Sequence, residues 1–170
     1  ELADTLPVWD FQLAETGSRI IRRRRQFVEE LSGIAKKIHA QLSGEREELL
    51  VTYEPSVKEE QFEEELLRVR ERDRRQCMTS VGPHRDDLLI SVDGIDIRKF
   101  GSQGQQRTSA LSLKLSEIEL VKKAIHETPV LLLDDVLSEL DSSRQNYLLS
   151  SIHDTQTLIT CTGLDEFVKN

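Results

Sequence analysis

The chain has 170 residues, of which 37% are hydrophobic and 32% charged, and 23 Lys and Arg against 31 Asp and Glu give a formal net charge of −8. This apolar content suffices for a folded core, although it is lean for a self-contained one. No run of ~18 apolar residues and no charged-then-apolar leader is present, so we expect neither a transmembrane helix nor a signal peptide. Cys77 and Cys161 lie far apart and share no metal-like spacing with histidine. We therefore expect no disulfide framework, no zinc site and a cytoplasmic protein.

The only methionine is Met78, and the chain begins with Glu1. Because a natural reading frame begins with Met, we expect these residues to be a segment of a longer protein.

Residues 1–76 are predicted to form long helices. Asp4 to Pro7 is typical of a helix start, and apolar residues then recur at helical spacing up to a stop at Gly44. The sequence around Gly17 could interrupt this helix. The expected apolar stripe consists of Trp9, Leu13, Phe27, Leu31, Ile34, Ile38 and Leu42.

One short strand and one charged helix are predicted next. The strand is expected at residues 49–53, and Ser56 and Glu59 have the spacing of a capping box that opens a helix ending near Arg75. Glu and Arg four residues apart should pair along it, as Glu64–Arg68 and Glu71–Arg75. Its inner face is expected at Phe62, Leu66 and Val69.

Residues 77–170 have a mixed α/β pattern. Two strands flank Asp93-Gly94, a strong hairpin signal. Short apolar runs then alternate with helical segments, which predicts a βαβ unit with parallel strands buried on both sides. The expected elements are strands at 88–92 and 95–100, a helix at 107–126, a strand at 130–133, a helix at 143–152 and a strand at 158–161. Since these strands cannot make a fully covered parallel sheet, we expect part of the sheet to come from elsewhere.

Two adjacent carboxylates, Asp134 and Asp135, end the predicted strand at 130–133. Ligands of open α/β sheets bind outside the carboxyl ends of the strands. A carboxylate placed there can hold a hydrated Mg²⁺ that bridges phosphate oxygens. The alternative is an acidic pair that caps a turn.

A loop rich in small residues, Gly101 to Arg107, precedes the helix predicted at 107–126. Exposed backbone N–H groups at a helix start form an anion site, to which Ser102 would add a hydroxyl donor. An ordinary helix cap is the alternative, and it is favoured when this loop is considered alone.

Considered together and in this order, the two motifs resemble those of a known family. Ser102 to Arg107 resembles the signature of ABC-type ATPases, and Leu132 to Asp135, followed by Ser138 to Asp141, resembles the Walker B strand and D-loop. With residues 79–87 and 6–14, the spelling is similar to the RecF family of recombination mediators. The resemblance spans essentially the whole chain.

This resemblance implies a fold and its domains. A helical lobe at residues 1–76 would be followed at 77–170 by the signature and Walker B half of an ABC-type ATPase head, with parallel strands and a β-hairpin.

The resemblance also implies residue roles. Asp134 would hold Mg²⁺, and Asp135 would polarise the water that attacks ATP. Asp141 would be the D-loop carboxylate at a dimer seam, and Thr162 would occupy the switch position. The signature residues that would contact the γ-phosphate of a nucleotide held by the other subunit are Ser102, Gly104 and Gln105.

Some residues depart from the family pattern. Gln103 replaces the first signature glycine, Asp135 is one methylene shorter than Glu, and Thr162 cannot titrate as a switch histidine would. We therefore expect slow, regulatory hydrolysis. Since no Gly-x-x-x-x-Gly-Lys-Ser/Thr sequence occurs, the chain alone is expected neither to bind ATP tightly nor to hydrolyse it.

The implied function is that of an ATP-dependent DNA-binding protein of recombinational repair, replication-fork maintenance and the SOS response. ATP would drive a homodimer that loads recombination machinery at gaps, with DNA (duplex or single-/double-strand junctions) and RecR- and RecO-type proteins as partners and no membrane. The alternatives are a non-catalytic docking module or a piece of another SMC- or Rad50-like ATPase. A transporter subunit is a weaker alternative, because the helices of residues 5–75 are too long and charged for a coupling domain.

A basic segment is the candidate DNA surface. Residues 18–42 carry seven Lys and Arg against two Glu, a local charge of +5, and Arg22 and Arg25 are one helical turn apart. A solvated face with pairs such as Arg25–Glu29 is the alternative.

The histidines have been given no role so far. His84 and Arg85 could couple the lobes, although a pair of Arg85 with Asp86 or Asp87 is the simpler interpretation. The isolated histidines expected at the solvated surface are His39, His126 and His153.

Overall fold

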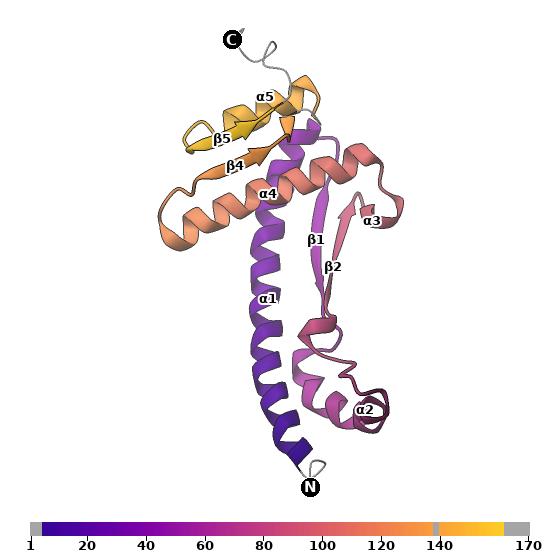
Figure 1. Ribbon diagram of the computed structural model, residues 1–170. Coiled ribbons are helices and arrows are strands. Elements are labelled where there is room, and N and C mark those ends of the chain that lie inside the picture. Colours follow the sequence, from indigo (N-terminus) through magenta and orange to yellow (C-terminus); the bar gives the residue numbers. More distant parts are fainter. Residues whose placement is uncertain (1–4, 138–139, 162–170) are drawn as a thin grey trace. The chain divides into compact units, whose positions relative to one another are not determined.

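The computed structural model describes residues 5–137 and 140–161, which form a mixed α/β fold, as the sequence predicts (Figure 1). The helices are α1 (Leu6–Ser43), α2 (Phe62–Gln76), α3 (Ile97–Phe100), α4 (Gln103–Ile125) and α5 (Ser142–Ser151), with short 3₁₀ turns η2 (Glu59–Gln61) and η3 (Pro83–Arg85). The strands are β1 (Leu49–Glu54), β2 (Asp87–Val92), β3 (Ile95–Asp96), β4 (Leu131–Asp134) and β5 (Thr157–Thr160). Within the described ranges, no helix is long and apolar enough to span a bilayer.

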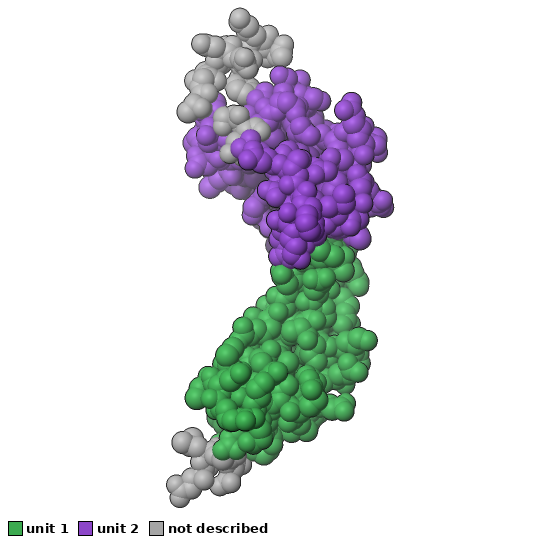
Figure 2. All heavy atoms as spheres, turned by 90° about the vertical axis from the view of Figure 1, so that its right-hand side faces the viewer, with its two compact units in different colours: residues 1–30, 51–89 green, residues 31–50, 90–170 purple. Residues whose placement is uncertain are grey.

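The chain divides into two compact units (Figure 2). Unit 1 comprises residues 1–30 and 51–89, and unit 2 comprises residues 31–50 and 90–170. The division expected after residue 76 falls inside unit 1. Helix α1 and strands β1 and β2 contribute residues to both units.

Helix α1 runs without a break through Gly17, so the interruption that the sequence allowed there does not occur. A Cβ atom at Gly17 would lie 2.3 Å from the Cε1 atom of Phe62. Gly17 therefore lets the Phe62 ring pack directly against the α1 backbone.

The buried side of α1 is rotated from the predicted stripe. Trp9 is 62% exposed and Phe27 is 46% exposed, whereas Val28 is buried. Besides Gly17, the buried positions are Ala14, Ile21, Val28, Leu31, Ser32, Ala35, His39 and Leu42.

The core of unit 1 is built around Phe62, which is fully buried. As predicted, Leu66 and Val69 join it on the inner face of α2. The other members are Ala14, Ile21, Val57 and Val81, with Tyr53 half-buried against them.

The predicted capping box before α2 is not formed. Lys58 is the residue before η2, and no side chain caps the turn. Ser56 instead exchanges hydrogen bonds with Gly82, its Oγ donating to the carbonyl at 3.0 Å and accepting from the N–H at 3.0 Å. The ion pairs expected four residues apart on α2 form three residues apart, as Glu65–Arg68 and Glu71–Arg74.

The predicted hairpin is present, but its second strand is short. β2 and β3 pair antiparallel with Val92 opposite Ile95, and the chain then turns into α3 because Asp96 accepts a hydrogen bond from the Arg98 N–H. β1, β2 and β3 form one sheet in that order.

The predicted βαβ unit in unit 2 is confirmed, since β4 and β5 pair in parallel with Leu133 opposite Ile159. Burial on both faces is not found: Leu133 is buried, but Leu132 is 72% exposed and Leu158 is 56% exposed. Helix α4 is longer than expected. Its inner face includes Leu111, Leu115 and Ile118, whereas Val121 and Ile125 near its end are exposed.

Candidate functional site

The loop from Gly101 to Gln105 starts α4 through a reciprocal capping box. The Ser102 Oγ accepts from the Gln105 N–H at 3.2 Å, and the Gln105 Oε1 accepts from the Ser102 N–H at 3.1 Å. The ordinary-cap interpretation of this loop thus describes its internal bonding. The Ser102 hydroxyl remains available to a ligand, because a hydroxyl that accepts one hydrogen bond can still donate its own proton.

The first turn of α4 is open to solvent. Ser102, Gln103 and Gly104 are exposed, and a Cβ atom at Gly104 would meet only the Ser102 Oγ, at 3.9 Å. Helix α4 has 23 residues, and its exposed start offers N–H groups and the positive end of the helix dipole to an anion.

Gln105 is fixed at both ends of its amide. While its Oε1 bonds to Ser102, its Nε2 donates to the Oε1 of Glu47 at 3.1 Å. Glu47 lies in the connection between α1 and β1 and also contacts His39, 3.3 Å from Nε2. Sequence reasoning missed Glu47.

The carboxylate pair ends β4, as predicted. The Thr160 hydroxyl of the neighbouring strand donates to the Asp134 Oδ1, and the Asp135 N–H donates to the Thr160 carbonyl at 3.1 Å. Asp135 has φ of +51°, a left-handed conformation that Asp tolerates better than most residues. The backbone therefore turns sharply here and exposes both carboxylates.

These two carboxylates fit a Mg²⁺ ion only in part. Among the described residues, no group of three or more His, Cys, Asp or Glu could enclose a metal. Mg²⁺ on nucleotides is commonly held by one or two carboxylates together with phosphate oxygens and water, and Asp134 with Asp135 can supply that share.

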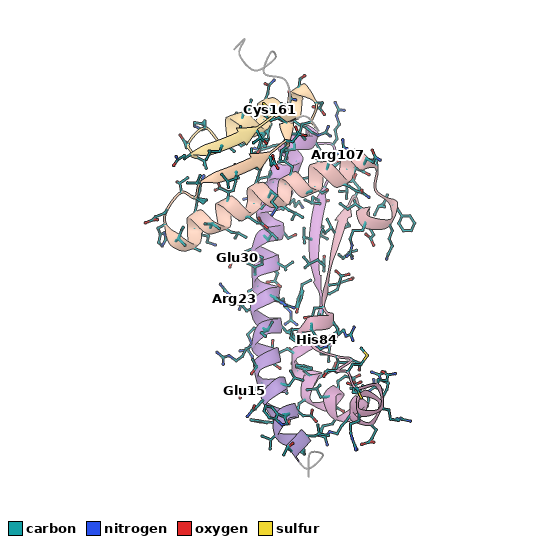
Figure 3. All side chains as sticks on the ribbon, viewed as in Figure 1. Glu15, Arg23, Glu30, His84, Arg107 and Cys161 are labelled. Atoms are coloured by element: carbon teal, nitrogen blue, oxygen red, sulfur yellow. The ribbon has the colours of Figure 1, made fainter. Side chains whose placement is uncertain are left out.

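Strand β4 returns along α4, so the end that carries Asp134 points back toward the start of α4, near Arg107 (Figures 1 and 3). A mostly apolar cavity of about 590 Å³ lies between the two elements. Its lining includes Arg107 and Leu111 of α4 and Leu131 and Leu133 of β4. The fold thus turns the exposed start of α4 and the carboxylate pair toward the same end of unit 2.

Asp141 begins α5 as its cap. Its carboxylate accepts from the Arg144 N–H at 3.0 Å and pairs with the Arg144 guanidinium. The pKa of the Asp141 carboxyl is lowered, mainly by the hydrogen bond from the Arg144 backbone N–H and further by the Arg144 guanidinium. Thr162, the expected switch position, lies outside the described residues, as do Ser138 and Glu139 of the expected D-loop.

The arginines of α1 in unit 1 are divided between two sides of the helix. Arg22 and Arg25 both reach Glu59, the first in a direct ion pair and the second at 3.9 Å. The expected Arg25–Glu29 pair is replaced by this contact. Arg24 reaches the Pro83 carbonyl and lies 3.6 Å from Asp86. Arg23 lies on the side of α1 that faces away from α2 (Figure 3).

The prediction of a solvated His39 is wrong: this side chain is fully buried. Its Nδ1 lies 3.1 Å from the Ser112 Oγ of α4. Burial lowers the pKa of His39, against the opposing hydrogen bond and charge of Glu47. The spacing Leu31, Ala35, His39 and Leu42 could have indicated this position, because it follows the buried stripe of α1.

The other histidines agree better with expectation. His126 and His153 are exposed, the latter beside Asp154 at 3.0 Å. The His84 Nε2 lies 2.9 Å from the Thr79 carbonyl. Arg85 contacts the sulfur of Met78, and Asp86 is bonded to Tyr53 and Ser56.

Comparisons with known proteins agree with the resemblance in the motifs. No protein-family model matches the chain. Curated relatives described as DNA replication and repair protein RecF match over 170 residues with 68% identity in Agathobacter rectalis and 55% in Lachnospira eligens. Each match covers 100% of this chain and 47% of the relative, so the chain spans about half the length of these relatives.

Solved structures give the same result. A structure described as the recombination mediator protein RecF with ATP in the RecFOR pathway matches 95% of this chain and 46% of that chain, with a TM-score of 0.84 and 38% identity. A second structure, described as RecF-ATPrS in the same pathway, matches 94% of this chain and 46% of that chain, with a TM-score of 0.81 and 38% identity.

Proposed function

Because this chain belongs over its whole length to the RecF family, we propose that it supplies the signature and Walker B half of an ATPase head that closes as a dimer on DNA. The observation that carries the proposal is the arrangement within unit 2. An open helix start at Ser102 and a carboxylate pair at the end of β4 are turned toward the same end of this unit.

In this proposal each motif has one task. The N–H groups at the start of α4 and the hydroxyl of Ser102 bind the γ-phosphate of ATP held by the other subunit, together with Gly104 and Gln105. Asp134 takes the metal position, where Mg²⁺ would neutralise phosphate charge. Asp135 accepts a hydrogen bond from the attacking water and orients it.

The proposal extends to the dimer seam and the partners. Asp141 would contact the second subunit while capping α5, and Thr162 would stand at the switch position. The machinery loaded would be that of recombinational repair, with DNA and RecR- and RecO-type proteins as partners. A non-catalytic docking module is the second candidate, because unit 2 exposes apolar residues of β4 and β5.

Ser102→Arg in a full-length RecF-type protein that contains this chain tests the proposal. A bulky cation at the start of α4 should block the second subunit's γ-phosphate while leaving each subunit's own nucleotide pocket intact. We expect nucleotide binding to persist and ATP-dependent dimerisation to be lost in sedimentation velocity. Dimers that form as in the parent would remove this loop from the mechanism.

The DNA contacts are proposed for the arginines of α1. Arg22 and Arg25, the pair predicted from the sequence, share Glu59, whereas Arg19 and Arg23 are exposed and, within the part of the chain that the structure describes, show no ion pair, so we favour the latter two as phosphate contacts. Each phosphate neutralised on duplex DNA contributes ~0.9 to the log–log salt slope. Replacing Arg19 and Arg23 by Ala should therefore flatten the slope by about 2, and replacing Arg22 and Arg25 should do less. Equal slopes in both double variants and the parent would rule out this face of α1.

A further inference from the structure

A continuous set of hydrogen bonds links the start of α4 to a buried histidine of α1, entirely within unit 2. Ser102 and Gln105 form two reciprocal hydrogen bonds between side chain and backbone. The Gln105 Nε2 donates to Glu47 at 3.1 Å, and Glu47 lies 3.3 Å from His39. His39 in turn lies 3.1 Å from Ser112, two turns further along α4. Glu47 is thus the bridge between α4 and α1.

The proton positions in this set follow from Ser112. Its single hydroxyl proton is donated to the Thr108 carbonyl at 2.7 Å, so its oxygen can only accept from His39. The His39 Nδ1 must therefore carry a proton. A neutral ring then presents the lone pair of Nε2 to the Glu47 carboxylate, and that contact becomes attractive only when a further proton is shared between them.

The surroundings of His39 limit that further proton. Burial disfavours a charged ring, and the nearby Arg144 guanidinium acts in the same direction, whereas Glu47 and Asp93 favour protonation. The Glu47 carboxylate is itself only half-buried. Its two oxygens face different neighbours: Oε2 lies beside the His39 ring, and Oε1 accepts a hydrogen bond from the Gln105 amide, which fixes that side of the carboxylate.

Gln105 is the third residue of α4 and belongs to the loop that we assign to the γ-phosphate. Its amide has one orientation that satisfies both Ser102 and Glu47, because the Ser102 N–H needs the oxygen and Glu47 needs the NH₂. Without Glu47, the Gln105 amide would lose the contact that fixes its orientation.

From this geometry we propose that Glu47, which lies between Gln105 and His39, is a positioning residue that fixes Gln105 and Ser102 in the orientation that contacts the second subunit's nucleotide. This inference rests on the proposed function. It adds a residue outside the signature and Walker B motifs and ties the α1–β1 connection to the assembly step.

The test uses a full-length RecF-type protein that contains this chain, with Glu47→Ala, Glu47→Gln and the neighbouring control Glu48→Ala. Glu48 pairs with the exposed Lys36, so its loss leaves Gln105 unaffected. Three quantities are measured: Tm, the nucleotide affinity of the monomer, and the ATP-dependent dimerisation constant from sedimentation.

We expect Glu47→Ala to weaken dimerisation by about tenfold, the effect of one charge-assisted hydrogen bond, with nucleotide affinity and Tm unchanged. Glu47→Gln should restore dimerisation to within about twofold, because its amide oxygen accepts from Gln105 and its NH₂ donates to the His39 Nε2. Glu48→Ala should match the parent.

Three results would overturn the inference: unchanged dimerisation in Glu47→Ala, a Gln variant that behaves like the Ala variant, or a loss of dimerisation matched by a fall in Tm. Ser102→Arg, measured in parallel, separates this inference from the proposed function. If Ser102→Arg abolishes dimerisation and Glu47→Ala does not, only the positioning role is wrong. If Ser102→Arg also dimerises normally, the proposed function is wrong as well.

Discussion

Units 1 and 2 differ in how completely the apolar side chains of α2 and of the β4–β5 pair are buried. In unit 1, Leu66 and Val69 of α2 are buried beside the ring of Phe62, which has no exposed surface. Unit 2 buries Leu133 but leaves Leu132 and Leu158 on the same two strands largely exposed. An exposed apolar face on a folded unit marks a surface that further protein covers. We therefore expect the core around Phe62 to be closed, although Trp9 and Phe27 of the same unit are exposed, and the strands of unit 2 to need a partner surface beside its candidate site.

The largest effect is expected from Phe62→Ala, which breaks the closed core of unit 1. Removing a fully buried ring should lower the free energy of unfolding by about 3–5 kcal/mol. Leu67→Ala on the same helix is the control, because Leu67 is 53% exposed and its loss should cost less than about 0.5 kcal/mol. Chemical denaturation followed by circular dichroism measures both, and equal losses would mean that α2 does not pack through Phe62.

A second effect should appear in alkali through Tyr53. Burial, followed by its hydrogen bond to Asp86, raises the pKa of Tyr53 to about 12. Since the folded-state pKa lies above the unfolded value of ~10, the stability that this hydroxyl contributes is present below pH ~10 and lost as pH rises through the folded value.

Ultraviolet titration of the tyrosinate band measures that shift. The chain has only 2 tyrosines, so a Tyr53→Phe variant leaves a single titration from Tyr147 and identifies the displaced one by difference. A Tyr53 that ionises near pH 10, as in a peptide, would show that the Tyr53–Asp86 contact is absent in solution.

The smallest effect is expected from Leu132→Gln in unit 2. Because this side chain is 72% exposed, its replacement should change the free energy of unfolding by less than about 0.5 kcal/mol. Leu133→Gln, one position along β4, should destabilise strongly because it buries an amide. Leu132→Gln should also reduce binding of a hydrophobic dye. Similar destabilisation by the two variants would show that both faces of β4 are covered.

The sequence predicted those features that depend on local periodicity. The inner face of α2 at Phe62 and the parallel pairing of β4 with β5 followed from spacing and from the order of elements. Gly17 was interpreted as a possible break in the helix. A glycine is needed there because the Phe62 ring, 45 residues away in the chain, packs against the helix backbone.

The candidate site shows the same limit. Ser102 and Asp134 were predicted from their motifs, but Glu47 was not, because its partners Gln105 and His39 come from α4 and α1, far from it or outside any motif. His39 was assigned to the surface because a single polar residue on a helix is usually solvated. Only packing against Ser112 reveals its burial.

The central claim is that unit 2 carries the catalytic and assembly motifs of an ATP-driven dimer. Asp135→Asn in a full-length RecF-type protein containing this chain tests it most directly, because the amide keeps the shape of the carboxylate and loses the charge that orients water. With ATP and Mg²⁺, sedimentation velocity should show a dimer that persists while phosphate release falls to background. A variant that hydrolyses ATP at the parental rate, or that stays monomeric with ATP while the parent dimerises, would contradict the account.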